Sequence, residues 1–166
     1  MAKWPNAAVC KTAIRGFDSR LRLIMKDKLF FIGLKAFIIN NEGKLLVLRG
    51  SNKMEVEGLW SLPGGRIQEG EEASLLEDIL RREIKEECGD IEVVLGKPFL
   101  VWRFYTPTKN IYLTGYRCLY IQGEITLDEE HTEYKWITQQ DVEALPFAST
   151  YKEIIMDFFN ERNLLK

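Results

Sequence analysis

The chain has 166 residues, 46% of them hydrophobic and 29% charged, which is enough apolar material for one folded domain with a core. Its formal net charge of −2 gives no overall attraction to nucleic acid or to an anionic membrane, and no apolar run reaches the roughly twenty residues that a membrane-spanning helix needs. The three cysteines and the single histidine, His131, form no zinc-type spacing. We therefore expect a cytoplasmic protein with no membrane anchor and no stable nucleic-acid partner.

Residues 1–28 form a basic N-terminal arm. Its cations are Lys3, Lys11, Arg15, Arg20, Arg22, Lys26 and Lys28, against only Asp18 and Asp27. The arm lacks the apolar stretch of a signal peptide, and its two aspartates argue against a transit peptide. Three interpretations stay open. Residues 12–25 pair with the sheet, contact a second subunit in a homodimer, or place positive charge near an anionic substrate.

The next segment reads as a β-hairpin. An apolar run over residues 29–40 leads into the turn residues Asn41, Glu42 and Gly43, and a second run follows over residues 44–49, ending at Arg49. After a polar loop, Gly64 and Gly65 give the backbone the freedom to approach a ligand closely.

An acidic helix follows these glycines. Ser74 and Glu77 have the spacing of a capping box, and Gly89 suits the helix end, which predicts a helix of about fourteen residues between them. A core-facing stripe begins with apolar residues and continues, at steps of three and four, into carboxylates. Its members are Leu76, Ile79, Leu80, Glu83, Glu86 and Glu87.

These carboxylates need a positive partner. At spacings of three and four they lie roughly 6 Å apart, and a close, partly buried pair repels by on the order of 3 kcal/mol at an effective dielectric constant near 20. A hydrated acidic face is the simpler interpretation. The alternatives that relieve the repulsion are Arg82, directly before Glu83, and a hard divalent cation bound by carboxylate and carbonyl oxygens.

The segment PGGRIQEGEEASLLEDILRREIKEECG resembles the signature box of the Nudix hydrolases, which cleave nucleoside diphosphates linked to another moiety. That box runs glycine, five residues, glutamate, seven residues, then Arg-Glu-apolar-any-Glu-Glu-any-Gly. Gly65, Glu71 and residues 82–89 match it in order, but ten residues rather than seven separate Glu71 from Arg82. We place the three extra residues in the turn before Ser74, because inside the helix they would rotate its ends by roughly 60°. The insertion leaves open whether Glu71 pairs with Arg82.

The resemblance implies a Nudix fold, an α/β/α sandwich with a mixed sheet, over residues 29–163. It also implies Mg²⁺ as cofactor, with Mn²⁺ as an alternative. Its metal ligands would be Gly65 through its carbonyl, Glu83, Glu86, Glu87 and Glu130. Arg82 would orient Glu83, and Arg49, Gly64 and Gly65 would contact the substrate.

Beyond the box, residues 92–95, 99–105 and 111–121 read as three strands. An acidic loop over residues 128–133 precedes a strand at 134–137. The resemblance places a catalytic carboxylate in this loop, six residues before Trp136, which selects Glu130, with Glu133 as the substitute if the loop is shifted in register. Glu83 and Glu130 compete as general base, and we favour Glu130 because its acidic neighbours should raise its pKa.

The C-terminal part is expected to be helical. Residues 139–145 read as a short helix, and Thr150 with Glu153 has capping-box spacing at the start of the last helix. A broad apolar face on that helix should pack against the sheet. It consists of Tyr151, Ile154, Ile155, Phe158 and Phe159.

The expected activity is magnesium-dependent hydrolysis of a diphosphate linkage in a nucleotide. Nucleoside triphosphates rank ahead of ADP-ribose-type sugars and dinucleoside polyphosphates as substrates. A rival interpretation is a Nudix-like module that binds a nucleotide or a partner and has lost catalysis. The three-residue insertion supports the rival. The retention of Glu83, Glu86 and Glu87 argues against it, because a pure binding module has no need for carboxylates that repel one another.

Overall fold

The computed structural model describes residues 30–55, 57–105 and 109–164. The basic arm at 1–28 lies outside them, so its three interpretations stay predictions. The described elements, in chain order, are β1 (Phe31–Ile39), β2 (Leu45–Gly50), β3 (Trp60–Ser61), α3 (Leu76–Cys88), β4 (Glu92–Tyr105), β5 (Asn110–Gln122), β6 (His131–Ile137), the 3₁₀ helix η2 (Gln139–Glu143) and α4 (Tyr151–Leu164).

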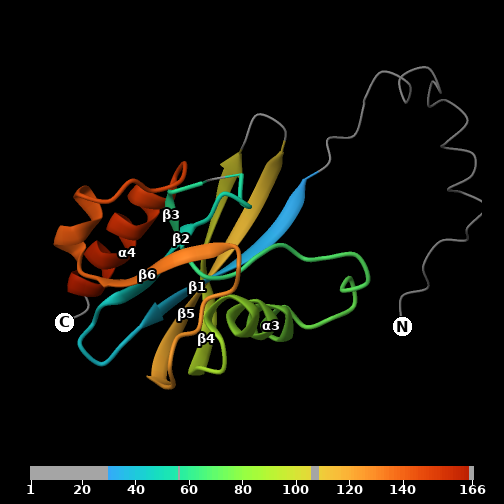
Figure 1. The fold of residues 1–166 in the computed structure, drawn as a ribbon, viewed down its shortest axis with the longest axis horizontal. Coiled ribbons are helices and arrows are strands. Elements are labelled where there is room, and N and C mark those ends of the chain that lie inside the picture. The colour runs from blue at the N-terminus through green and yellow to red at the C-terminus, as the bar shows by residue number, and fades with distance from the viewer. Residues whose placement is uncertain (1–29, 56, 106–108, 165–166) are drawn as a thin grey trace, which may run out of the picture.

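One mixed six-stranded sheet forms the middle layer. The strand order is β3-β2-β1-β5-β4, and β6 pairs with β2. Strands β1 and β5 run parallel, while the other pairs are antiparallel. Helices α3 and α4 lie on opposite sides of the sheet (Figure 1). This is the predicted α/β/α sandwich.

Alternation along β1 divides the core between the two helices. Leu34, Ala36 and Ile38 are fully buried on the α3 side, whereas Phe37 packs on the α4 side against Phe158. Lys35 has the same parity as Phe37 and therefore points to the α4 side of the sheet.

The segment at residues 63–67 completes the sheet beside the first half of β1. Leu34 N–H donates to the Gly65 carbonyl at 2.8 Å, Ala36 N–H donates to the Pro63 carbonyl at 2.9 Å, and Ile67 N–H donates back to the Ile32 carbonyl at 3.0 Å. Only the far end of β1 pairs with β2, at Ile39 and Leu45. This arrangement carries the glycine turn directly past the middle of β1.

Helix α3 confirms the predicted helix but corrects its start. Ile79 and Leu80 are buried as expected, whereas Leu76 is 38% exposed. The residue before the helix is Leu75, which makes no side-chain cap, so the predicted capping box of Ser74 and Glu77 is wrong. The periodicity identified the face of the helix, but it carries no information on how far the sheet covers that face.

Three other expected elements differ. Residues 92–105 form the single strand β4, with register shifts on both sides of Pro98, instead of two strands. Strand β6 begins at His131, so Glu133 belongs to a strand and not to the acidic loop. The capping box of Thr150 and Glu153 is also absent, because the buried Thr150 hydroxyl has no hydrogen-bond partner among the described residues.

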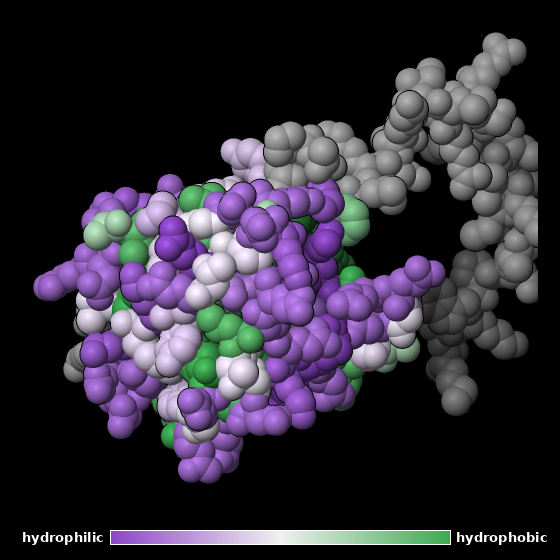
Figure 2. Space-filling model, viewed as in Figure 1, coloured by the Kyte–Doolittle hydropathy of each residue, from purple (hydrophilic) through white to green (hydrophobic). Residues whose placement is uncertain are grey.

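No helix in the described part of the chain is long and apolar enough to cross a membrane. Hydrophilic residues cover most of the face seen in Figure 2; the most evident apolar group lies near the centre of that face, and smaller ones lie toward its edges.

Candidate active site

Helix α3 presents its three glutamates at different depths. Glu83 and Glu87 are each 7% exposed, while the side chain of Glu86 is 54% exposed. Arg81 and Lys85 project outward as expected. The acidic stripe therefore divides into a buried pair and an outer carboxylate.

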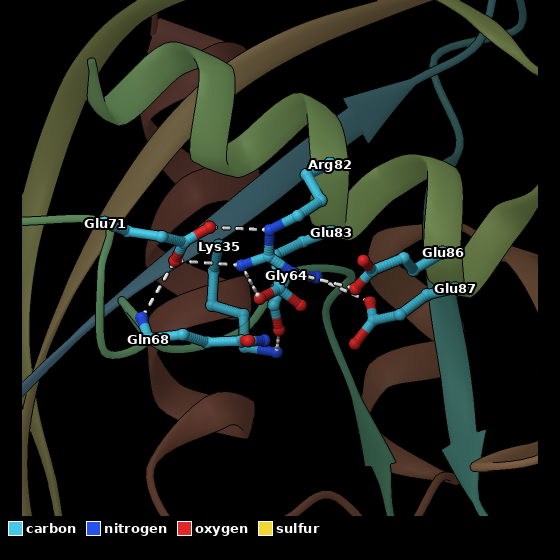
Figure 3. Close-up of polar contacts among 8 residues, drawn as sticks. All are labelled: Lys35, Gly64, Gln68, Glu71, Arg82, Glu83, Glu86 and Glu87. Atoms are coloured by element: carbon cyan, nitrogen blue, oxygen red, sulfur yellow. Dashed lines mark hydrogen bonds and ion pairs between the residues drawn. The ribbon is translucent and has the colours of Figure 1, made fainter. Parts of the chain in front are cut away.

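Arg82 binds the outer side of this stripe, which is the side that carries the exposed Glu86. Its Nε donates to Glu71 at 2.7 Å, and Nη2 donates both to Glu71 at 3.1 Å and to Glu83 at 2.8 Å. Nη1 donates to Glu86 at 2.7 Å. The turn at residues 68–75 absorbs the three extra residues, and the Glu71–Arg82 pair that the insertion left open is present (Figure 3).

On the inner side of the acidic stripe, which carries the buried Glu87, two charged groups hold Gly64. Its N–H donates to Glu87 Oε2 at 2.6 Å, and its carbonyl accepts from the ammonium of Lys35, which also donates to the Leu62 carbonyl at 2.8 Å. Gly64 has a φ of +115°, and a Cβ there would lie 2.3 Å from the Leu34 carbonyl oxygen. Only glycine fits this position.

Burial perturbs the ionisation of the inner groups. Desolvation raises the pKa of Glu87 to about 7, against the lowering effect of the Lys35 charge and the Gly64 N–H. Desolvation likewise raises the pKa of Glu83, although Arg82 opposes the shift. Burial on its own would lower the pKa of Lys35, but Tyr151, Glu87 and Glu83 raise it, so Lys35 stays protonated.

A pocket of about 540 Å³ opens beside these groups. Of the residues singled out in the sequence, it is lined by Gly64, Gly65, Glu83, Glu87 and Glu130. Its apolar walls come from Met54, Phe104, Ile111, Leu113 and Tyr151, and its cationic residues are Lys35, Lys53, Arg66 and Lys109. The pocket lining thus combines carboxylates, apolar side chains and cations.

Four predicted site residues are not in the pocket lining. Arg82 and Glu86 lie on its outer side. Arg49 donates to the Gly58 carbonyl at 3.1 Å and pairs with Glu133 at 3.5 Å. Arg49 and Glu133 are therefore ion-pair partners, and neither lines the pocket.

The oxygen donors around Gly64 suit a hard divalent cation, although they are not assembled into a complete cluster. No three carboxylate, imidazole or thiolate groups among the described residues are close enough to hold a metal ion. The Gly65 carbonyl is engaged by Leu34 N–H, whereas the Gly64 carbonyl and the buried Glu83 and Glu87 surround a region where Lys35 supplies the positive charge. Hard divalent cations take carboxylate and carbonyl oxygens as ligands, so the chemistry of these donors fits one.

The family model of the NUDIX domain matches residues 31–158. The chain belongs to the Nudix family. Among curated relatives, a protein named nucleoside triphosphatase NudI from Escherichia fergusonii is 33% identical over 118 residues, covering 63% of this chain and 80% of the relative. A NudI protein from Enterobacter sp. strain 638 is 31% identical over 121 residues, covering 65% and 82%. This Nudix chain is accordingly a pyrophosphohydrolase.

Solved Nudix structures share its fold. The MutT protein of Methanosarcina mazei Go1 superimposes with a TM-score of 0.72 at 26% identity, over 84% of this chain and 99% of that one. The NUDIX domain of Shewanella oneidensis NrtR, solved in complex with ADP ribose, gives a TM-score of 0.64 at 18% identity, over 95% and 99%. The second likeness concerns the fold alone.

Sequence reasoning missed Lys35 and treated Tyr151 only as a packing residue. The signal for Lys35 was present, because a lysine within the apolar run of a central strand is rare unless it is paired. What the run could not reveal is that the glycine turn at residues 63–67 passes beside β1 and offers its carbonyls to the ammonium.

Proposed function

We propose that this enzyme hydrolyses a diphosphate linkage in a nucleoside triphosphate with the help of Mg²⁺. The observation that carries the proposal is that Glu83 and Glu87 line the same pocket as Phe104, Ile111 and Leu113. Carboxylates can hold a metal ion that binds phosphates, while an apolar and aromatic wall can hold a base.

The metal site is proposed around Gly64, Glu83 and Glu87. The Gly65 carbonyl accepts from Leu34 N–H and the Gly64 carbonyl accepts from Lys35, so each oxygen keeps a second lone pair for a metal ion. Gly65 stays a proposed ligand, and we add Gly64 because Glu87 binds its N–H. Glu86 can join this set through its second carboxylate oxygen, because Arg82 Nη1 contacts only Oε2, at 2.7 Å. Bound Mg²⁺, or Mn²⁺ in its place, would neutralise phosphate oxygens and lower the pKa of a coordinated water.

Glu130 is the proposed general base. Its backbone is fixed, since its carbonyl accepts from Ser51 N–H at 2.7 Å, while its side chain is exposed and lines the pocket. A solvent-accessible carboxylate in the same pocket as the buried pair can remove a proton from water and release it to bulk solvent. Glu83, bound to Arg82, would be oriented as a metal ligand. Glu133 is the less favoured base, since it is engaged by Arg49.

The choice of triphosphate follows from the relatives, two of which carry the name nucleoside triphosphatase. The cationic residues Lys53, Arg66 and Lys109 offer a path for a polyphosphate along the pocket. ADP-ribose is the second candidate, because a structural neighbour was solved with it. Arg49 would contact the substrate only after releasing Glu133.

The cellular setting is also part of the proposal. Cys88 and Cys118 are free and buried, which suits a reducing cytoplasm. A small nucleotide is the expected partner, and a homodimer through the basic arm at residues 1–28 stays open.

The test is a hydrolysis screen over nucleoside triphosphates, ADP-ribose and dinucleoside polyphosphates, each with Mg²⁺, with Mn²⁺ and with EDTA. We expect the highest kcat/KM with a nucleoside triphosphate and no turnover in EDTA. Turnover that persists in EDTA would remove the metal from the mechanism. Nucleotide binding without turnover under every condition would support the rival binding module.

A further inference from the structure

Lys35 occupies an unusual place for a lysine. It lies in the middle of β1, between the fully buried Leu34 and Ala36, and its register partner on β5 is Gly115. The Lys35 stem lines the pocket floor, and its ammonium reaches the glycine turn. Its side chain is half-buried, and a lysine inside a central strand is rare unless its charge is compensated.

The acceptors of Lys35 are main-chain carbonyls and not carboxylates. The ammonium donates to Leu62 and Gly64, and no carboxylate of the described residues lies within ion-pair distance of it. By contrast, the pocket lysines Lys53 and Lys109 pair with Glu129 and Glu55. Lys35 therefore acts on the conformation of the turn as well as on the local charge.

Gly64 is fixed from three directions. Glu87 binds its N–H, the Leu34 carbonyl leaves no room for a side chain, and Lys35 binds its carbonyl oxygen (Figure 3). The first two contacts set where the residue lies. The third contact is the one made to the carbonyl oxygen itself.

We propose that Lys35 is a positioning residue that orients the Gly64 carbonyl as a metal ligand, in a site whose carboxylates are Glu83 and Glu87. The inference rests on the metal site of the proposed function. Hydrogen bonds from outside the coordination shell orient histidine and carboxylate ligands, and loss of such a bond weakens metal binding roughly 10- to 100-fold. Lys35 would orient a carbonyl ligand in the same way.

A competing role for Lys35 predicts the opposite sign. Removing a positive charge from an acidic site by itself favours the entry of another cation. If Lys35 only competes with the metal, Lys35→Met tightens metal binding. If it orients Gly64, Lys35→Met weakens it. The direction of the change therefore decides between the two roles.

The experiment is an Mn²⁺ titration without nucleotide, with free Mn²⁺ followed by electron paramagnetic resonance. It uses Lys35→Met, Lys35→Arg and the control Lys85→Met. Met keeps the chain length without charge or donors, and Arg keeps both. Lys85 is an exposed lysine on α3, the helix that carries Glu83 and Glu87, and it is paired with Asp90 at 2.9 Å.

We expect Lys35→Met to weaken Mn²⁺ binding roughly 10- to 100-fold, Lys35→Arg to recover most of the loss, and Lys85→Met to bind like wild type. At saturating metal, Lys35→Met should lower kcat while leaving KM within about threefold. Unchanged or tighter Mn²⁺ binding in Lys35→Met overturns the proposal, as does a lower Tm in EDTA with normal metal affinity. If Lys35→Met does not fold, Lys35→Gln takes its place, because it also removes the charge and gives the same test of sign.

The binding measurement separates this proposal from the function. A wild-type protein that binds Mn²⁺ but hydrolyses no nucleotide would refute the proposed activity and leave the Lys35 result standing. A wild-type protein that binds no Mn²⁺ would overturn the role of Lys35 directly.

Discussion

Two cations compensate the acidic stripe of α3, and they do so in different ways. On the outer side, Arg82 touches Glu71, Glu83 and Glu86 directly, at 2.7 to 3.1 Å. On the inner side, Lys35 bonds to the carbonyls of Leu62 and Gly64 and acts on Glu87 through space.

The difference shows which side is adapted for chemistry. Arg82 and Glu86 are partly in water, where a salt bridge contributes about 0–1 kcal/mol, and the Glu71 carboxyl has its pKa lowered by Arg82 and by Gln68 N–H. The outer side is therefore saturated with charge pairs. On the inner side, burial raises the pKa of Glu87, and the Gly64 carbonyl is polarised by Lys35. A metal cation would therefore gain favourable contacts with both groups.

The largest effect should come from removing the inner carboxylate. Glu87→Gln removes a buried negative charge from the metal site, and we expect it to lower kcat/KM roughly 10⁴-fold. Glu86→Gln changes the exposed carboxylate bound to Arg82 and should cost less. Steady-state hydrolysis at several Mg²⁺ concentrations measures both. Equal losses in the two variants would show that Glu86 contributes to the metal site as much as Glu87 does.

The next test assigns the proton acceptor across the pocket. Glu130→Gln should lower kcat by roughly 10² to 10⁴, the range for loss of a general base, while Mn²⁺ affinity changes little. It should also abolish the acidic limb of the pH–rate profile. Glu83→Gln is the companion variant, because it lies in the buried pair. If the acidic limb survives in Glu130→Gln and disappears in Glu83→Gln, the base is on the helix.

Local pattern was sufficient for the acidic helix and for the hairpin, because both depend on short-range periodicity and turn residues. Local pattern failed where contacts between distant segments determine the structure. Gly96 and Pro98 looked like a break, yet β4 continues through them as an edge strand, the position in a sheet where proline and register shifts are tolerated.

The sequence predicted the carboxylates of the candidate site but not its inner cation, Lys35. Glu83 and Glu87 came from their spacing, and Arg82 from its adjacency to Glu83. Lys35 meets Gly64 only because the turn at residues 63–67 pairs with β1, and no pattern within either segment contains that pairing.

Substitutions at two glycines compare the inner side of the acidic stripe, at Gly64, with the turn on its outer side, at Gly70. Gly64→Ala places a Cβ 2.3 Å from the Leu34 carbonyl oxygen at a φ of +115°, and we expect about 3–5 kcal/mol of destabilisation. Gly70→Ala also has a positive φ, of +93°, but its Cβ meets nothing within 4 Å, so about 1 kcal/mol should be lost. Urea unfolding in EDTA compares them. Similar losses would mean that backbone strain, and not the close approach to β1, dominates at Gly64.

The smallest effect is the pH dependence of stability without metal, and it again distinguishes inner from outer carboxylates. Burial raises the folded-state pKa of Glu87 to about 7 from an ordinary value of 4.5, so the folded protein holds a proton that the unfolded chain releases. The corresponding stability is fully present below about pH 4.5 and is lost as the pH rises through 7, with an upper bound of about 3 kcal/mol. A glutamine resembles the protonated acid. In EDTA, therefore, Glu87→Gln should match wild type near pH 5 and exceed it by about 1–3 kcal/mol near pH 8, measured by urea unfolding. The exposed Glu86→Gln should follow the wild-type curve at both values. Should Glu87→Gln instead lose stability at pH 8, the carboxylate is stabilised in place by Lys35 and Gly64 N–H, and the inner side is a satisfied ion site even without metal.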